Sequence, residues 1–309
     1  MIKYDELLSD KNHRWIHLES PDRKEIERMK NNYGIPRDFI SDMYDPFEVA
    51  RSEYLEKDEQ HAKLLLIEHV QLRNNHTQDE EFVTLPLSII LVENRIITVS
   101  RQTPDFLEKI YKKYFTSSKA KIKDIQEFLL LILHENEKYF IGALRRIFGK
   151  IERMRIDVQH SSGNKELYRQ IAIEKSIIIL RDGIKSNRSV IETFQEYPLI
   201  PPTNEHLNKM HDVLVDSRQA EQMAQTCSNL ADHLSSLFDN VISNNLNTIM
   251  KTLTSITIIL TIPTIVGGLW GMNVRLPIEN HPQAFSISLL FIILLSLLAY
   301  WWLKKNDYF

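Results

Sequence analysis

The chain has 309 residues, and its 38 basic and 41 acidic residues give a formal net charge of −3. This balance does not support a nucleic-acid-binding protein, which needs a basic excess on one face. Cys227 is the only cysteine, so a disulfide framework and a multi-cysteine metal site are both excluded.

Residues 1–120 are predicted to form a cytosolic α/β domain. The runs AKLLLIEHVQL, FVTLPLSIILV and RIITVS are short, apolar and rich in β-branched residues, which favours strands. The segment PDRKEIERMKNNYG has proline near its start and glycine at its end, as helices often do. We therefore expect a mostly central sheet accompanied by helices.

Residues 121–202 are predicted to be a helical part of the same cytosolic domain. Apolar residues recur at three- and four-residue spacing through IKDIQEFLLLILHENEKYFIGALRRIFGKIERMRIDV, and the break HSSGNKE precedes a second helix through LYRQIAIEKSIIILRDGIKSNRSVIETFQEY. The segment PLIPPTN ends that helix. Thr203 or Asn204 is expected to cap the next one, because Pro202 blocks its continuation backwards.

A single long helix is expected to follow, with residues 203–250 as a stalk and residues 251–274 as the first transmembrane helix. After Asn204 no proline occurs before Pro263 and no glycine before Gly267. Such a helix would contain about 65 residues and be about 100 Å long. Few soluble helices reach that length without a partner, so we expect it to pack against copies of itself.

Two uncharged segments near the C-terminus are predicted to cross a membrane as a helical hairpin. The first lies between Lys251 and Arg275 and is about 34 Å long as a helix, enough for a hydrocarbon core of about 30 Å. The second, with residues 283–303 as its helix, ends in aromatic residues followed by Lys304 and Lys305, as at a membrane interface. The alternative, two buried core helices of a soluble protein, is disfavoured by the length and pairing of the segments.

Lysines indicate which side of the membrane this hairpin starts from. Lys251, Lys304 and Lys305 lie at the ends that share one side, and the positive-inside rule places that side in the cytoplasm. Residues 275–282 then form an external loop, and residues 304–309 form a basic cytosolic tail. We therefore expect a multi-pass protein of the plasma or inner membrane with both termini in the cytoplasm.

Polar residues form a stripe along the first transmembrane segment. Their spacing alternates between three and four residues, which keeps them on one side of a helix. The stripe contains Asn247, Met250, Thr254, Thr257, Thr261, Thr264, Gly268 and Gly271. Threonines in a bilayer can also bond to their own helix or join two helices, but the strict register favours a wet surface that several copies turn into a tube. A tube of hydroxyls, amides and carbonyls without fixed charge suits Mg²⁺, an ion that keeps its water.

The tripeptide Gly271-Met272-Asn273 carries a resemblance to a known family. It follows Trp270, closes the first membrane segment and precedes one last apolar segment. With its α/β domain, long stalk and basic end, the chain resembles the CorA family of divalent-cation transporters over its full length. The resemblance implies a homopentameric funnel in the lipid bilayer that takes up hydrated Mg²⁺ passively. It further implies Co²⁺ or Ni²⁺ as additional ions, the membrane potential as driving force, gating by cytosolic Mg²⁺ and no enzymatic activity.

The resemblance also assigns roles to particular residues. The tripeptide would form the outer selectivity filter, and Glu279 would concentrate cations at its mouth. Met250 and Leu253 would form an apolar constriction that gates by dewetting. The expected pore lining is Asn247, Met250, Leu253, Thr254, Thr257, Thr261, Thr264 and Gly268.

Regulatory Mg²⁺ is expected, by the same resemblance, on carboxylates between subunits. Asp212 lies where a stalk aspartate is expected when residues are counted back from Asn247. Asp79, Glu80 and Glu81 are the candidate partners from the α/β domain. The alternative for all four is that they are ordinary surface acids.

Two other functions stay open at this point. The first is transport of Zn²⁺, Co²⁺ or Ni²⁺ on the same scaffold, because Trp270 stands where tyrosine or phenylalanine is commoner and the external loop carries Arg275. The second is a membrane-anchored scaffold whose stalk oligomerises without a pore. An anchor does not need the threonine spacing.

An enzyme is the least supported class. His206 and His211 are five residues apart, and His13 and His17 are four apart, but neither pair has a clear third metal ligand. The chain also lacks a phosphate-binding glycine loop and a nucleophile elbow.

Overall fold

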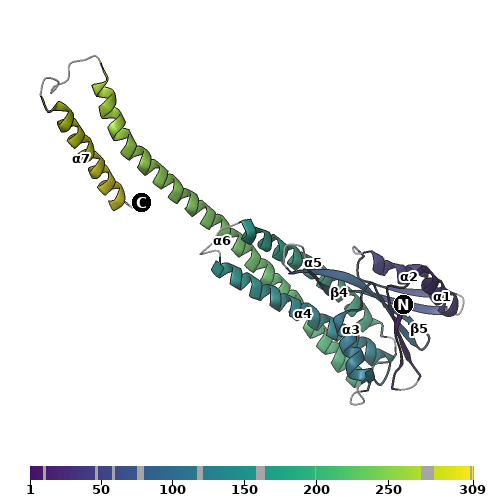
Figure 1. Cartoon of the computed structure of the whole chain (residues 1–309). Coiled ribbons are helices and arrows are strands. Elements are labelled where there is room, and N and C mark those ends of the chain that lie inside the picture. Colours follow the sequence, from purple (N-terminus) through teal and green to yellow (C-terminus); the bar gives the residue numbers. More distant parts are fainter. Residues whose placement is uncertain are drawn as a thin grey trace. The chain divides into compact units, whose positions relative to one another are not determined.

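The computed structural model of the protein forms two compact units, Met1–Ser235 and Ser236–Phe309, which are described separately here (Figure 1). The first unit contains a sheet with helices on both faces, and the second contains the apolar C-terminal helices. The structure describes residues 1–9, 12–45, 48–57, 60–74, 80–116, 121–157, 164–198, 200–272, 282–306 and 308.

A six-stranded sheet forms the centre of the first unit. Its strand order is β1-β2-β6-β5-β4-β3, and only the β2–β6 pair is parallel. The β-branched runs of the sequence form β4, β5 and β6, as predicted. The strands are β1 (Ile2–Leu7), β2 (Arg14–Glu19), β3 (Arg51–Lys57), β4 (Gln60–Asn74), β5 (Glu80–Val92) and β6 (Arg95–Ser100).

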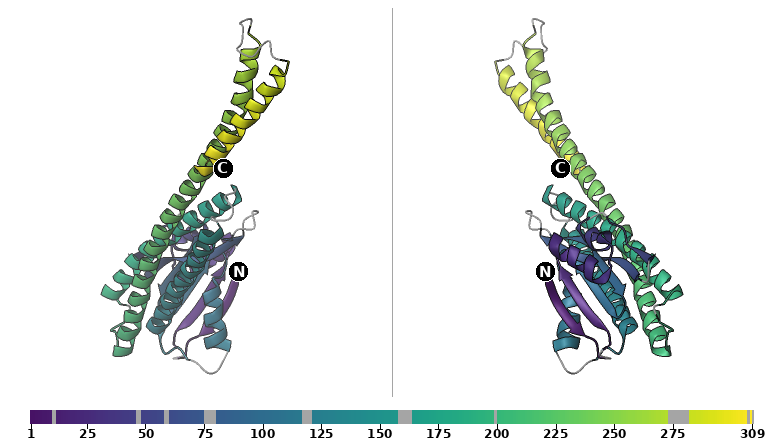
Figure 2. Two further views of the ribbon diagram at one scale, coloured as in Figure 1. Left: turned by 90° about the vertical axis from the view of Figure 1, so that its left-hand side faces the viewer. Right: turned by 90° about the vertical axis from the view of Figure 1, so that its right-hand side faces the viewer.

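Helices cover both faces of this sheet (Figures 1 and 2). Because alternate residues of a strand point to opposite faces, Leu64 and Leu66 of β4 join a core with α1 (Arg23–Tyr33), α2 (Arg37–Ser41) and η1 (Asp42–Tyr44). Leu65 and Ile67 join the opposite core, which the later helices complete. Those helices are α3 (Asp105–Ile110), η2 (Tyr111–Thr116), α4 (Ile125–Asp157) and α5 (Asn164–Glu196).

Helix α1 shows how local sequence sets an element's limits. The side chain of Asp22 accepts a hydrogen bond from the Glu25 N–H (2.8 Å), and the Glu25 side chain accepts one from the Asp22 N–H (2.9 Å). This reciprocal capping box satisfies backbone donors that the first turn leaves free. Gly34 ends the helix at φ 64°, a left-handed conformation that glycine adopts without strain.

Helix α5 crosses the edge of β4 where that edge has lost its strand partner. Strand β3 pairs with β4 only as far as Leu66. At the next step Asn187 accepts a hydrogen bond from the Glu68 N–H (2.7 Å) and donates one to the Glu68 C=O (2.8 Å), to which Asn136 also donates (2.9 Å). Gly183 allows this approach, because a Cβ there would lie 2.9 Å from Thr84 Cγ2.

Helix α6 (Asn204–Trp270) starts in the first unit and packs along α4 and α5. Thr203 caps it by accepting a hydrogen bond from the His206 N–H (3.2 Å), which confirms one of the two predicted caps. Helices α4 and α6 run parallel, because the residue numbers of contacting partners differ by a nearly constant amount. Glu127 binds Lys209 and His134 binds Asp216, each pair 82 residues apart. Leu144 contacts Cys227, 83 residues further along the chain.

The face of α6 that packs on α4 and α5 follows a three- and four-residue spacing. Most of its buried side chains are small, and long polar side chains flank them. Helix α5 runs antiparallel to α6, with Arg188 bonded to Glu221 and Glu174 bonded to Ser235. The buried residues of this seam on α6 are Met210, Val213, Ser217, Ala220, Ala224, Cys227, Ala231 and Leu234.

The second unit contains the remainder of α6 and α7 (Ala284–Lys305). The helix α6 continues through Pro263 to Trp270, giving the 67-residue helix that the sequence led us to expect. The buried hydroxyl of Ser255 donates to the Tyr308 C=O (3.4 Å), and the Lys251 ammonium lies 5.9 Å from the centre of the Tyr308 ring.

Candidate functional site

Two of the described helices, α6 and α7, are long and apolar enough to cross a membrane. Only 6% of the apolar window in each is buried inside the structure. A core helix of a soluble protein would bury most of such a window. The apolar C-terminal segments therefore do not behave as core helices of this chain.

The predicted polar stripe lies on the part of α6 in the second unit. Thr254, Thr257, Thr261 and Thr264 are all exposed there. The hydroxyls of the last three donate to their own helix, to the C=O groups of Leu253 (2.8 Å), Thr257 (2.7 Å) and Leu260 (2.9 Å). The sequence left open whether such hydroxyls bond to their own helix or line a wet surface, and within one chain they do the former.

This bonding decides which chemistry the stripe offers to a ligand. A threonine hydroxyl has one proton and two lone pairs. When the proton is donated to the helix, the oxygen faces outward as an acceptor only. The water molecules around a cation point their hydrogens outward, so a hydrated cation is a donor that matches these oxygens.

Back-bonding alone does not distinguish the stripe from the rest of α6. Thr248 and Thr252 lie off the stripe, and they donate in the same way to the C=O groups of Asn244 (3.0 Å) and Thr248 (2.9 Å). What distinguishes the stripe is register: its oxygens follow one another along one side of the helix.

The N-terminal end of the stripe presents larger side chains. Asn247 is exposed, and Met250 and Leu253 are exposed by 59% and 57%. Nothing in the described part of the single chain covers them. Two large apolar side chains open to the surroundings, one turn before the first stripe threonine, are the residues that several copies could bring together around an axis.

The opposite end of α6 closes with glycine. The Gly271 N–H donates to the C=O groups of Gly267 (3.0 Å) and Gly268 (3.2 Å), and the Met272 N–H donates to Leu269 (3.3 Å). A Cβ at Gly268 would meet open space, and the Met272 side chain is 55% exposed. Two further predicted site residues, Asn273 and Glu279, lie outside the described residues.

Pro263 changes the backbone of α6 within this apolar segment. Proline has no N–H, so it cannot donate to the C=O of Ile259 four residues earlier. That carbonyl oxygen is therefore an additional acceptor within the membrane segment. Broken helical bonds of this kind occur in membrane helices where neighbouring helices or water satisfy the freed group.

Asp212, the predicted stalk carboxylate, is exposed on α6 beside a cavity of about 280 Å³. The cavity is lined by acids and bases together: Glu127, His134 and Glu135 face it along with Lys113, Lys138 and Lys209. The described residues of one chain contain no cluster of three or more potential metal ligands. Asp212 is therefore accessible, but it does not form a complete metal site within one chain.

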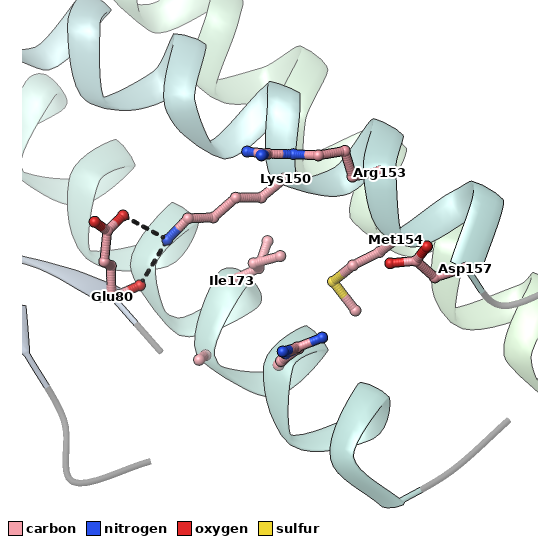
Figure 3. A pocket seen from close by; sticks show the side chains of 8 residues that line it. Glu80, Lys150, Arg153, Met154, Asp157 and Ile173 are labelled. Atoms are coloured by element: carbon pink, nitrogen blue, oxygen red, sulfur yellow. Dashed lines mark hydrogen bonds and ion pairs between the residues drawn. The ribbon is translucent and has the colours of Figure 1, made fainter. Parts of the chain in front are cut away.

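The predicted partner carboxylates Glu80 and Glu81 pair with lysines. Figure 3 shows Lys150 reaching Glu80, with its ammonium 3.2 Å from the carboxylate and 3.0 Å from the C=O, at the rim of a cavity of about 280 Å³. Glu81 is 4% exposed and lies 2.8 Å from Lys175. The remaining candidate, Asp79, lies outside the described residues.

The histidine pairs considered for an enzyme do not come together as sites. Burial lowers the pKa of His17 to about 4, and its ring nitrogens contact the hydroxyls of Thr98 (2.9 Å) and Thr103 (2.9 Å). The His206 Nε2 lies 3.1 Å from Asp124, and its Nδ1 accepts a hydrogen bond from the Thr203 N–H (3.4 Å), whereas His211 is exposed. These contacts account for the buried histidines as structural groups.

One buried acid was not predicted from the sequence. Glu137 on α4 is 1% exposed. The signal was present in the sequence, because Glu137 interrupts the apolar three- and four-residue spacing of Leu130, Leu133, Phe140 and Leu144. A charged residue at a core position calls for a partner or a function.

Comparisons with known proteins agree with this arrangement. A sequence model of a family described as CorA-like Mg²⁺ transporter protein matches residues 10–305. No curated protein matches the sequence. The complete structure of the CorA magnesium transporter from Methanocaldococcus jannaschii is similar, with a TM-score of 0.80 at 20% identity over 98% of this chain and 93% of that chain.

Two further solved structures share the fold. The full-length CmaX protein gives a TM-score of 0.70 at 15% identity over 98% of this chain and 90% of that chain. The cytoplasmic domain of ZntB from Vibrio parahaemolyticus gives 0.59 at 14% identity over 75% and 88%. The predicted architecture of an α/β domain, a long helix and a final apolar helix is thus confirmed.

Proposed function

Because the chain belongs to the CorA-like Mg²⁺ transporter family, we propose that it forms a homopentameric pore for passive uptake of hydrated Mg²⁺. The observation that carries the proposal is the exposed stripe of threonine oxygens on α6, which ends at Gly271-Met272. Copies of α6 that turn this stripe toward a common axis produce a tube lined by acceptors. Co²⁺ and Ni²⁺, which also carry ordered water, are further candidate ions.

The pore conducts because its lining binds weakly. Each contact is a hydrogen bond from the ion's water to a neutral oxygen, so the ion is held at many similar positions and released from each. A ring of carboxylates along the tube would bind a divalent ion more tightly and slow its release. The proposed lining is Asn247, Met250, Leu253, Thr254, Thr257, Thr261, Thr264 and Gly268.

Selection takes place at the outer end, where Gly271, Met272 and Asn273 form the filter. Glycine leaves room for a hydrated ion, and the Asn273 amide offers a further neutral acceptor. Glu279 adds a negative charge at the mouth and raises the local cation concentration. The assignments of Asn273 and Glu279 rest on the sequence.

The gate lies at the other end, where Met250 and Leu253 meet across the axis. A narrow apolar ring excludes water and therefore excludes a hydrated ion until the helices move apart. With the termini in the cytoplasm, the membrane potential draws Mg²⁺ inward, because two charges gain about 4.6 kcal/mol per 100 mV. No enzymatic step is needed.

Cytosolic Mg²⁺ regulates the gate by bridging carboxylates of neighbouring subunits. Asp212 is the preferred ligand, because it is exposed and forms no ion pair with a lysine of the described residues, whereas Glu80 and Glu81 do. Binding at Glu80 or Glu81 would first have to displace Lys150 or Lys175. The ion stabilises the closed arrangement, and its loss shifts the population toward the open one.

Uptake of Mg²⁺ into liposomes tests the proposal. We expect Asn273→Ala to abolish most uptake, whereas Asn306→Ala, an asparagine at the end of α7, leaves the rate unchanged. Asp212→Ala should permit uptake at high internal Mg²⁺, where the unmodified protein is closed. Uptake by Asn273→Ala at the unmodified rate would remove the filter assignment.

A second candidate ion is Zn²⁺, which Trp270 and Arg275 beside the proposed filter leave open. Cobalt hexaammine, which imitates hydrated Mg²⁺ but cannot lose its ligands, separates the two. Inhibition of uptake by this complex supports a pathway for hydrated ions. A scaffold without a pore would show no flux of any divalent ion, and replacing its threonines would not change its behaviour.

A further inference from the structure

The seam between α4 and α6 in the first unit contains a carboxyl group in an unusual position. Glu137 is 1% exposed, and its Oε2 has no hydrogen-bond partner among the described residues. The Oγ of Ser217 on α6 is likewise buried without a partner in the described part of the chain. The offset of 82 to 83 residues between α4 and α6 brings Glu137 within one turn of Ser217.

The charged groups around Glu137 do not neutralise it. Asp216 on α6 is the neighbouring charge, and it repels an ionised carboxylate. Asp216 is itself paired with His134, whose Nε2 lies 3.1 Å away. Burial and Asp216 together raise the pKa of Glu137 to about 8 from its ordinary 4.5. The carboxyl group is therefore protonated around neutral pH.

Within the part of the chain that the structure describes, the other elements that pack here bring no cation to Glu137. On α5 the buried groups at this level are uncharged, such as Asn187 and Val190, while Arg188 lies at the surface with Glu192 and Glu221. On β4, burial lowers the pKa of His69 to about 4, so this ring is uncharged near neutral pH. The bound proton therefore removes the charge of Glu137, and with it the free-energy cost of burying that charge in the seam.

We propose that Glu137 is a proton-binding site in the α4–α6 seam, and that release of its proton shifts the seam toward an open form. An ionised Glu137 costs least when water reaches it, and water reaches it only when α6 separates locally from α4. The seam thus responds to pH through one side chain. This inference concerns the first unit alone and stands whether or not the chain conducts ions.

The sign of the response follows from proton linkage. The closed seam holds the proton up to about pH 8, whereas the open seam, with a solvated glutamate, loses it above about pH 4.5. Between these values the open form gains about tenfold in relative population per pH unit. Above about pH 8 both forms are ionised and the dependence levels off.

Infrared difference spectroscopy of the full-length protein in lipid nanodiscs tests proton binding directly. We expect the carbonyl band of a protonated carboxyl group to disappear between neutral and alkaline pH in the unmodified protein. The band should be absent throughout in Glu137→Gln, whose amide imitates the protonated acid and should preserve the fold. Glu135→Gln is the matched control, because Glu135 lies two residues away and binds Lys138 (3.6 Å).

Hydrogen exchange of residues 213–224 of α6 tests the opening. Protection factors, which correct for the intrinsic pH dependence of exchange, should fall about tenfold per pH unit from about pH 6 to pH 8. Glu137→Gln should show a flat profile, and Glu135→Gln should show the full slope. Asp216→Asn should move the end of the slope to lower pH by removing the repulsive charge.

Two results would overturn the proposal. One is an alkaline loss of the carboxyl band that persists in Glu137→Gln, which would assign the proton to another group. The other is an identical pH dependence of protection in Glu137→Gln and the unmodified protein. Neither readout involves ion flux, so failure here is distinct from failure of the proposed transport function.

Discussion

Helix α6 passes through both compact units, and its two halves present different surfaces. In the first half every third or fourth residue is buried against α4 and α5, including Val213, Ala220 and Ala224 at 0% exposure. In the second half large apolar residues stay open, with Ile249 and Leu260 each 62% exposed. The first half of α6 thus buries its apolar face against other helices of the same chain, whereas the second half leaves its apolar residues exposed.

The side chains explain this difference. The seam of the first half contains alanine, serine and cysteine, small side chains that are buried there. The second half replaces them with isoleucine, leucine and threonine, which suit lipid contact and contact between membrane helices. The contrast indicates that the first half completes its packing within one chain, whereas the described part of the chain leaves the apolar surface of the second half uncovered.

The largest expected effect tests the self-sufficiency of the first unit. Asn187→Leu removes both hydrogen bonds between Asn187 and the Glu68 main chain, and leaves the half-buried Glu68 N–H without its side-chain partner. We expect a loss of about 3 kcal/mol in the free energy of unfolding. Hydrogen exchange of the β4 and β5 amides in the full-length protein measures it.

Asn136→Leu is the matched control for this change. Asn136 donates a hydrogen bond to the Glu68 C=O, which Asn187 still satisfies after the substitution, so we expect a loss of about 1 kcal/mol. Equal losses from the two variants would show that the orphaned N–H is not the cause.

These asparagines also show what the sequence could and could not predict. Local signals sufficed for strands β4, β5 and β6, for the end of α1 at Gly34, and for the approximate length of α6. The hydrogen bond between Asn187 and Glu68 joins residues that are 119 positions apart. Helical periodicity and capping patterns concern neighbouring residues, so they cannot predict such a pair. The parallel pairing of β2 with β6 is non-local in the same way.

The candidate site likewise contains features that local sequence predicts and features that only the fold reveals. The threonine stripe depends only on helical spacing, so the sequence shows it as clearly as the structure does. The lysine partners of Glu80 and Glu81 come from α4 and α5, 70 and 94 residues away, and only the fold reveals them. Glu137 could have been noticed from its place in an apolar repeat, but its unpartnered oxygen could not.

The next effect in size compares the two halves of α6 directly. Ala220→Leu forces extra carbons into a seam where Ala220 is 0% exposed, and we expect it to destabilise the first unit by about 2 kcal/mol. Leu260→Ala, at a 62% exposed position, should leave the stability of the first unit unchanged. Urea unfolding followed by exchange of the β4 amides reports both, and a comparable loss from Leu260→Ala would contradict the division.

The smallest expected effect concerns the polar register of the second half. Thr257→Val keeps the shape of the side chain but removes one stripe oxygen and its bond to the Leu253 C=O. If the stripe lines the pathway, every subunit loses one acceptor at the same level. A barrier higher by about 1.4 kcal/mol then slows Mg²⁺ uptake about tenfold.

Thr252→Val separates this role from simple helix stabilisation. Thr252 makes the same kind of bond, to the Thr248 C=O, but lies off the stripe. Both substitutions therefore cost the helix the same internal hydrogen bond, and only Thr257→Val changes the surface that the copies are proposed to share. Equal slowing by the two variants would mean that the threonines serve the helix itself, and the second half of α6 would then owe its exposed surface to lipid alone.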